Sequence, residues 1–230
     1  MNRFFLQIYI LYISTIFLTT FLLYKMELTY SEKVRRYLSK CTVGIAGCGG
    51  LGSNCAISLA RAGVGKLIIA DFDIVTVENL ERQYYFHDQV NKLKVHALRD
   101  NILRIDPSIT VKPFDLKLCS SDVIELFAGC DVIVEAFDKA EMKQMIIESV
   151  INHLPGKPLV CGIGLAGFGK TDYLKVIRTG NLIVCGDQKS EVTEDNPLTA
   201  PRVGIVSNME ANETIEILMS KFKTWNENIA

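Results

Sequence analysis

The sequence lacks any CxxC pair among its seven cysteines, and their number is odd. Disulfide scaffolds of small secreted proteins use even sets of cysteines, so this pattern favours reduced thiols in a cytosol. Most of the cysteines are therefore expected to act as small buried hydrophobic side chains. They are Cys41, Cys48, Cys55, Cys119, Cys130, Cys161 and Cys185.

The chain also lacks an excess of charge of either sign. Its formal net charge is -1 and its pI is near 6.3. A protein that grips a phosphate backbone needs a basic field, so nucleic acid is not the expected partner. With 230 residues, of which 49% are hydrophobic and 22% charged, the chain has the composition of one globular domain.

The first 25 residues differ from the rest of the chain. Residues 4–24 carry no charge and are long enough to span a bilayer, but they include several polar side chains and are closely followed by Met26. No small-residue cleavage site follows, which argues against a removable signal peptide. We interpret residues 1–25 as a mis-assigned start, with a membrane anchor as the alternative. Both interpretations leave residues 26–230 as a cytoplasmic domain, because basic residues follow the apolar run.

Short apolar runs alternate with segments of helical periodicity from residue 42 onward. The expected strands are 42–46, 66–71, 110–114, 131–136 and 159–161. The expected helices are 30–40, 52–62, 91–105, 122–128, 141–154 and one that closes the domain at Met219. This alternation predicts an α/β fold, a Rossmann-like doubly wound and mostly parallel sheet. Two further runs, 173–177 and 182–185, predict a C-terminal antiparallel hairpin, followed by a loop over 186–201.

A glycine-rich turn lies between the first expected strand and the helix that follows it. Its glycines are Gly47, Gly49, Gly50 and Gly52. Backbone N–H groups at such a turn, together with the helix dipole, form a site for phosphate groups. Asp71 ends the second strand, where an acid binds the ribose hydroxyls of a nucleotide. These features alone suit any dinucleotide enzyme, including an NAD(P)-dependent oxidoreductase. The alternative without a ligand is that the glycines are needed only for packing.

Residues 71–83 narrow this interpretation. The segment GCGGLGS at 47–53, followed by DFDIVTVENLERQ at 71–83 and then by Lys94 and Asp138, resembles the nucleotide site of the ThiF/MoeB/HesA family. This family is related to ubiquitin-activating enzymes, and the similarity covers residues 42–219 in order and spacing. The resemblance implies an ATP-dependent adenylyltransferase that activates the C-terminal glycine carboxylate of a ubiquitin-like sulfur-carrier protein and releases pyrophosphate.

The resemblance also implies roles for individual residues. In such a reaction charge builds on the phosphoryl oxygens and on the leaving pyrophosphate, so cations must neutralise it. Arg82 and Lys94 would contact the phosphates, with Asp138 holding Mg²⁺. Asp71 would bind the ribose, while Asn79 and Gln83 supply polar contacts. Asp73 would support Mg²⁺ or orient Arg82.

The chain departs from the family at its sulfur ligands. Many members hold a structural zinc with two CxxC pairs, and tetrahedral coordination requires four close ligands. This chain has no such pair, and its three histidines are scattered, so no zinc is expected. Cys185 stands alone where the first pair would lie, and the loop at 186–201 has no cysteine. We expect a structural Cys185 and adenylation without a catalytic thioester.

The short, zinc-free form is most similar to the ThiF type, which adenylates the sulfur carrier ThiS for the thiazole of thiamine. Two alternatives share the fold: an adenylyltransferase for the molybdopterin sulfur carrier, and a tRNA threonylcarbamoyladenosine dehydratase. An NAD(P)-dependent oxidoreductase would leave Arg82, Lys94 and Asp138 without a role. The resemblance further implies a homodimer in which each pocket is partly covered by the neighbour.

Overall fold

The structure, a computed structural model, describes residues 28–222. The interpretation of residues 1–25 therefore concerns a segment outside the described range. The chain divides into two compact units, 1–35 and 36–230, and α2 (Tyr30–Leu38) crosses their boundary. Thr29 and Glu32 cap the start of α2 with reciprocal hydrogen bonds. None of the helices within residues 28–222 combines the length and the apolar character that crossing a membrane requires.

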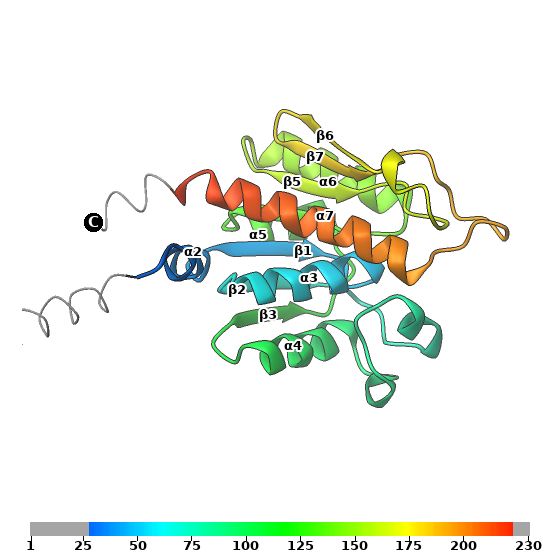
Figure 1. The fold of residues 1–230 in the computed structure, drawn as a ribbon, viewed down its shortest axis with the longest axis horizontal. Helices are drawn as coiled ribbons and strands as arrows, with labels where there is room; N and C mark the ends of the chain where they lie inside the picture. Colours follow the sequence, from blue (N-terminus) through cyan, green and yellow to red (C-terminus); the bar gives the residue numbers. More distant parts are fainter. Residues whose placement is uncertain (1–27, 223–230) are drawn as a thin grey trace, which may run out of the picture. The chain divides into compact units, whose positions relative to one another are not determined.

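Unit 36–230 is built on a seven-stranded sheet with the order β3-β2-β1-β4-β5-β7-β6 (Figure 1). All neighbours pair in parallel except β6 and β7, which are antiparallel. The strands are β1 (Thr42–Ala46), β2 (Lys66–Ala70), β3 (Thr110–Phe114), β4 (Val132–Glu135), β5 (Leu159–Gly162), β6 (Lys175–Thr179) and β7 (Leu182–Gly186). From β1 the chain adds β2 and β3 on one side and then crosses to add β4 on the other side. In open α/β sheets, ligands bind outside the carboxyl ends of the two strands at this change of direction.

Helices cover both faces of the sheet. One face carries α3 (Gly50–Ala62), α4 (Lys94–Ile105) and α7 (Ala200–Met219), and the other carries α5 (Ser120–Phe127) and α6 (Ala140–His153) (Figure 1). Short 3₁₀ helices lie at Val77–Glu81, His87–Gln89 and Thr171–Tyr173. The predicted doubly wound α/β fold and its C-terminal hairpin are confirmed.

The core beneath α5 and α6 shows why β1 contains a glycine in its middle. Phe127 is fully buried at the end of α5 and packs with Ile133, Ile146 and Leu159. A Cβ atom on Gly44 would lie 2.5 Å from the Phe127 ring. The glycine therefore makes room for the largest fully buried side chain of this core.

The helix expected from residue 91 begins instead at Lys94. Asn91 has a φ of 69°, a left-handed conformation that Asn tolerates and that a helix interior excludes. Its N–H donates to Val75 O, while Val75 N–H donates to Lys92 O. The backbone of residues 91–92 is thus bonded to the segment after β2, and helical bonding starts only beyond it.

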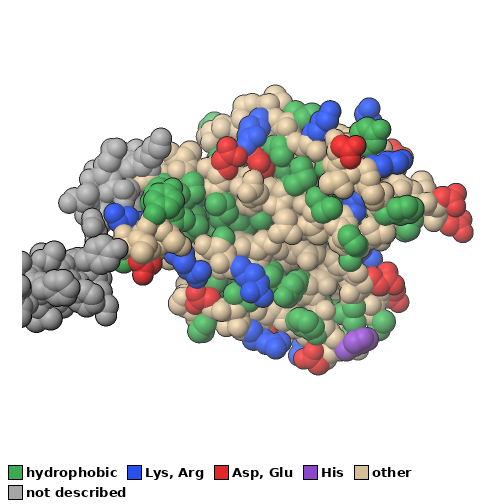
Figure 2. Space-filling model, in the orientation of Figure 1, with side chains coloured by type: hydrophobic (Ala, Val, Ile, Leu, Met, Phe, Trp, Pro, Cys, Tyr) green, Lys and Arg blue, Asp and Glu red, His purple; other side chains and the backbone are tan. Residues whose placement is uncertain are grey.

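On the face of the molecule shown in Figure 2, basic and acidic side chains are interspersed over α3, α4 and α7. This mixture agrees with the formal net charge of -1. A strong field of one sign does not form on this face.

Glu210 is a buried carboxyl group in the interior of α7. The residue is 0% exposed, and neither of its carboxyl oxygens has a hydrogen-bond partner among the described residues. It lies against β5, since a Cβ atom on Gly162 would be 2.8 Å from Glu210 Oε1. Burial raises the pKa of Glu210 well above its ordinary value, Glu135 raises it further, and the positive charge of Lys143 opposes them. Burial without a hydrogen-bond partner therefore favours the neutral form of Glu210 over the charged one.

We expect Glu210→Gln to stabilise the fold increasingly as pH rises. A raised pKa in the folded state means that folding takes up a proton above the unfolded pKa of about 4.3. This contribution is complete at acid pH and declines as pH rises toward the folded pKa. We would measure the free energy of unfolding in urea at pH 6, 7 and 8. The value for the variant minus that for the wild type should increase by up to about 1.4 kcal/mol per pH unit.

Glu216→Gln, at an exposed position further along α7, controls for the loss of one carboxyl group from this helix. If the difference in free energy of unfolding between Glu210→Gln and wild type stays constant across this pH range, Glu210 does not take up a proton on folding.

Candidate functional site

A cleft of ≈ 370 Å³ opens at the carboxyl ends of β1, β2 and β4. Most of the residues singled out from the sequence line it: Gly47, Gly49, Gly50, Asp71, Asp73, Arg82, Gln83, Lys94 and Asp138. Gly52 and Asn79 are not among the lining residues. The cleft thus brings together predicted residues that range from Gly47 to Asp138 in the sequence, because parallel strands bring their carboxyl ends to one edge of the sheet.

The glycine turn between β1 and α3 is packed too tightly for side chains at two positions. Gly47 has a φ of +99°, and a Cβ atom there would lie 2.8 Å from Ala136 O. A Cβ atom on Gly52 would lie 1.9 Å from Gly47 O, so Gly52 lets the first turn of α3 approach the loop. Gly49 differs, because a Cβ atom there would meet only Gln83 Nε2, at 3.9 Å. Gly49 therefore leaves space at the cleft surface that a side chain would occupy.

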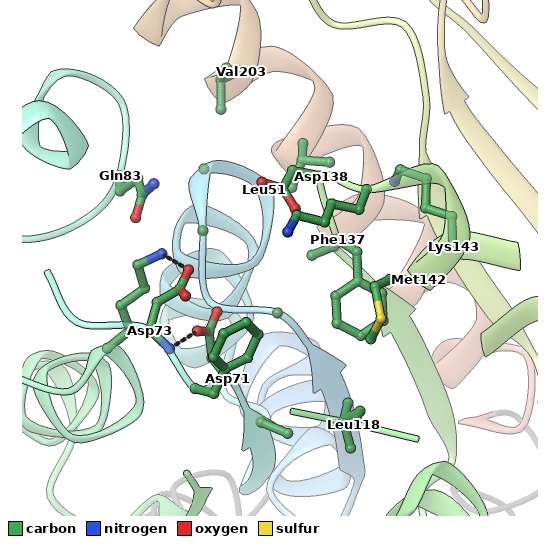
Figure 3. A pocket seen from close by; sticks show the side chains of 18 of the residues that line it. Leu51, Asp71, Asp73, Gln83, Leu118, Phe137, Asp138, Met142, Lys143 and Val203 are labelled. Atoms are coloured by element: carbon green, nitrogen blue, oxygen red, sulfur yellow. Dashed lines mark hydrogen bonds and ion pairs between the residues drawn. The ribbon is translucent and has the colours of Figure 1, made fainter. Parts of the chain in front are cut away.

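Asp71 bonds the glycine turn to the segment after β2. Its Oδ2 accepts a hydrogen bond of 2.6 Å from the N–H of Cys48. Its Oδ1 accepts one of 2.8 Å from the N–H of Asp73 (Figure 3). Burial raises the pKa of Asp71, whereas the charge of Lys94 and these two hydrogen bonds lower it. Each carboxylate oxygen retains a second acceptor site for a ligand hydroxyl.

Lys94 and Asp73 form an ion pair within the cleft. Lys94 Nζ lies 2.8 Å from Asp73 Oδ2, and the lysine side chain is buried while that of Asp73 is half exposed (Figure 3). Lys94 is the first residue of α4, and its own N–H donates to Asp73 O. Asp73 thus pairs with Lys94, and Arg82 has a different partner, the carbonyl oxygen of Glu78 at 3.4 Å.

Asn79 supports the turn that carries Arg82 and Gln83. Its side-chain oxygen accepts the N–H of Thr76, and its carbonyl oxygen accepts the N–H groups of Arg82 and Gln83. Gln83 Oε1 is buried without a hydrogen-bond partner among residues 28–222. An unpaired buried amide oxygen costs free energy, so this atom is suited to a donor on a ligand.

Glu135 and Lys143 belong to the site, and the sequence analysis missed both. Lys143 lines the cleft and donates from Nζ to both carboxyl oxygens of Glu135, each at 3.0 Å, and to Gly162 O at 2.9 Å. Glu135 Oε1 also accepts the N–H of Phe137 at 2.6 Å, next to Asp138. Burial raises the pKa of Glu135, and the charge and hydrogen bonds of Lys143 oppose this rise. The pair fixes the loop that carries Asp138.

The cleft has two apolar regions beside its charged one. Leu116, Leu118, Phe137 and Met142 line one side, next to Asp71. Leu165, Val192, Leu198 and Val203 line another, on loops and on the first turn of α7. The charged part suits a polyphosphate, and the apolar parts suit flat or uncharged groups.

Six of the seven cysteines, including Cys185, are buried, and only Cys119 is exposed. Burial, together with the negative charges of Glu210 and Glu213, raises the pKa of the Cys185 thiol to about 12, and the charge of Arg178 opposes this rise. Nucleophilic cysteines are accessible and have lowered pKa values. Cys185 therefore has the properties of a structural residue.

The chain is similar in sequence to known proteins over most of its length. The model of the ThiF family matches residues 24–229. Among curated proteins, the molybdopterin-synthase adenylyltransferase of Salmonella typhimurium is 30% identical over 189 residues, which cover 79% of this chain and 74% of the relative. The probable adenylyltransferase/sulfurtransferase MoeZ of Mycobacterium tuberculosis is 35% identical over 130 residues, but the match covers only 56% of this chain and 32% of that protein.

Solved structures show the same fold. The tRNA N6-threonylcarbamoyladenosine dehydratase TcdA of E. coli, solved in complex with ATP, has a TM-score of 0.75 at 21% identity and covers 84% of this chain and 91% of its own. E. coli MccB in complex with succinimide has a TM-score of 0.64 at 22% identity, with coverage of 83% and 59%. Because the family model matches residues 24–229, which include the whole described range, this chain belongs to the ThiF family.

Proposed function

We propose that the chain uses ATP to adenylate the C-terminal glycine carboxylate of a ubiquitin-like sulfur-carrier protein, with release of pyrophosphate. The observation that carries this proposal is the convergence of Arg82, Lys94 and Asp138 on the glycine turn in one cleft. The names of the curated relatives, which are adenylyltransferases, support the same reaction. A dinucleotide oxidoreductase would account for the glycine turn and Asp71 but would leave the combination of Arg82, Lys94 and Asp138 unexplained.

In this proposal the phosphates of ATP lie over the glycine turn. The N-terminus of α3 points into the cleft, and its free N–H groups and positive dipole end attract anions. Asp71 accepts the ribose hydroxyls with the acceptor sites that Cys48 and Asp73 leave free. Gln83 Oε1 gains the donor that it lacks within the described chain.

The adenylation step exchanges one phosphorus–oxygen bond for another. A carboxylate oxygen of the carrier attacks the α-phosphorus, and the bond from that phosphorus to the oxygen bridging to the β-phosphorus breaks. Negative charge then builds on the α-phosphoryl oxygens and on the leaving pyrophosphate. Arg82 and Lys94 stabilise this charge, and because the attacking group is the carboxylate of the carrier, no cysteine of the enzyme is required.

Asp138 is the residue proposed to hold Mg²⁺. It is exposed and lines the cleft at the end of β4. Within residues 28–222 no group of three or more His, Cys, Asp or Glu side chains is arranged to hold a metal. Mg²⁺ fits such a site, because it is usually held by one or two carboxylates together with phosphate oxygens and water. When bound, it neutralises charge on the phosphates.

The finer proposal is that the carrier is ThiS and that the reaction serves thiazole synthesis for thiamine. It depends on the similarity of the short form without paired cysteines to the ThiF type. The molybdopterin sulfur carrier is the competing substrate, which the name of the Salmonella typhimurium relative favours. We also propose a homodimer, on the same family resemblance.

A second candidate is a tRNA threonylcarbamoyladenosine dehydratase. The likeness to the dehydratase TcdA, with a TM-score of 0.75, favours it. The mixed surface charge in Figure 2 and the near-neutral net charge disfavour tRNA as a partner. ATP–pyrophosphate exchange measured with purified ThiS, with the molybdopterin carrier and with modified tRNA separates these functions. An oxidoreductase would give no exchange with any of the three.

We expect Arg82→Ala to lose carrier-dependent pyrophosphate exchange by about a hundredfold, because removing a cation that stabilises developing phosphate charge costs on the order of 3 kcal/mol. Thermal stability should stay close to wild type, since Arg82 is only partly buried. Arg99→Ala is the matched control, because Arg99 pairs with Asp100 on α4 and does not line the cleft. Full exchange activity in Arg82→Ala would refute the proposed role of this cleft.

The glycine turn provides a second test. Gly49→Ala should fold normally but bind ATP about tenfold more weakly, because the added methyl group projects where the phosphates approach. Gly52→Ala should instead unfold at lower urea concentration, since its methyl group would overlap Gly47 O. Calorimetric titration with a non-hydrolysable ATP analogue and urea unfolding measure the two effects. Unchanged ATP affinity in Gly49→Ala would place the phosphates elsewhere.

A further inference from the structure

Two loops form the apolar side of the cleft mouth, and they are bonded to each other. One runs from 163 to 174 after β5, and the other from 187 to 199 between β7 and α7. The N–H of Gly167 donates to Pro197 O at 2.8 Å, and the hydroxyl of Thr199 donates to Gly167 O at 2.7 Å. A movement of either loop would therefore move the other.

A buried ion pair ties both loops to the first turn of α7. Arg202 is 4% exposed, and its Nη2 donates to Oδ2 of Asp187, whose side chain is 9% exposed. Arg202 Nη1 donates to Gly169 O at 2.6 Å, so one guanidinium contacts both loops. A lysine has one nitrogen and lacks the fork that reaches two separate acceptors.

Asp187 in turn organises its own loop. Its Oδ1 accepts the N–H groups of Lys189 and Ser190, at 2.9 and 2.8 Å, and its Oδ2 accepts the Ser190 hydroxyl. Burial raises the pKa of Asp187, but the Ser190 and Lys189 hydrogen bonds and the charge of Arg202 outweigh it, so the pKa is lowered. Asp187 is thus ionised at neutral pH and remains paired.

The two loops contribute no charged side chain to the cleft lining. Their lining residues are Leu165, Val192 and Leu198, whereas the cations and carboxylates come from the segments after β2, β3 and β4 and from helices α4 and α6. If ATP occupies the charged region, as the proposed function requires, the apolar mouth is left for the uncharged peptide chain that leads to the reacting carboxylate.

We propose that Arg202 and Asp187 are positioning residues that hold the two loops in the shape that receives the acyl substrate. Neither residue lines the cleft itself. This inference rests on the proposed function for the identity of the substrate, but the loop geometry that it invokes can be measured without any substrate.

The test uses Arg202→Met in the full chain, with three measurements. Trypsin cleavage after Lys189, identified by mass spectrometry, should accelerate about tenfold as the loop loosens. The affinity for a non-hydrolysable ATP analogue should stay within about twofold of wild type. In pyrophosphate exchange, the KM for ThiS, or for the molybdopterin carrier if only that one is active, should rise about tenfold while the KM for ATP changes little.

Arg178→Met is the matched control, because the ion pairs of Arg178 on β6 go to Glu213 and Glu216 of α7 and not to either loop. It should leave loop cleavage and both KM values unchanged. Asp187→Asn replaces Arg202→Met if the latter fails to fold, since it removes the charge at constant size and should give the same pattern.

Two outcomes overturn the inference. Unchanged cleavage after Lys189 in both variants would show that the pair does not hold the loop. An equal rise of the KM for ATP and for the carrier would show a general structural effect. If the wild type gives no exchange with either carrier, the proposed function fails, and the cleavage rate and ATP affinity still decide whether the pair positions the loops.

Discussion

The carboxylate of Asp71 joins two strand ends, and the charged side of the cleft depends on that junction. It accepts the N–H of Cys48 from the turn after β1 and the N–H of Asp73 from the segment after β2. The N–H of Gly47 also donates to Ala70 O, so turn and strand are held at two neighbouring points. Because Asp73 then pairs with Lys94, the position of the buried cation follows from the same carboxylate. The glycine turn alone would fix neither the junction of the two strand ends nor the position of Lys94.

The ion pair between Lys94 and Asp73 also suits a site that must accept an anion. A buried lysine without a partner would pay a large desolvation cost, which Asp73 reduces. An ammonium group has three donors, and the described contacts of Lys94 Nζ engage one of them with a side chain. Lys94 can therefore keep Asp73 and bind a phosphate oxygen at once, so that the cation need not be released before the ligand arrives.

The fold could be predicted from the sequence because its signals are local. The apolar run of β1 and the turn at Gly180 between β6 and β7 each specify their element within a few residues. Much of the cleft was found because its residues follow strands or lie in a recognisable segment. Lys143 could not be found in this way, because it reaches Glu135 and Gly162 only when α6 packs on the sheet. Asn79 was expected to contact the ligand, and the structure shows its side chain accepting the N–H of Thr76 in a capping box. The three-residue spacing of Thr76 and Asn79 is the signal from which this bond could have been predicted.

Helix α7 takes part in two interactions whose stabilisation depends on pH in opposite ways. One is its ion pair with the loop after β7, and the other is the packing of Glu210 against β5. Asp187 has a lowered pKa through its contact with Arg202 and the loop, so its stabilisation is present above its unfolded pKa and is lost as pH falls. Glu210 has a raised pKa, so its stabilisation is present in acid and is lost as pH rises. Acid therefore weakens the attachment of the mouth loops, whereas alkali strains the packing of α7 on β5. Both the acid and the alkaline loss of stability therefore act on α7, because its first turn carries Arg202 and its middle carries Glu210.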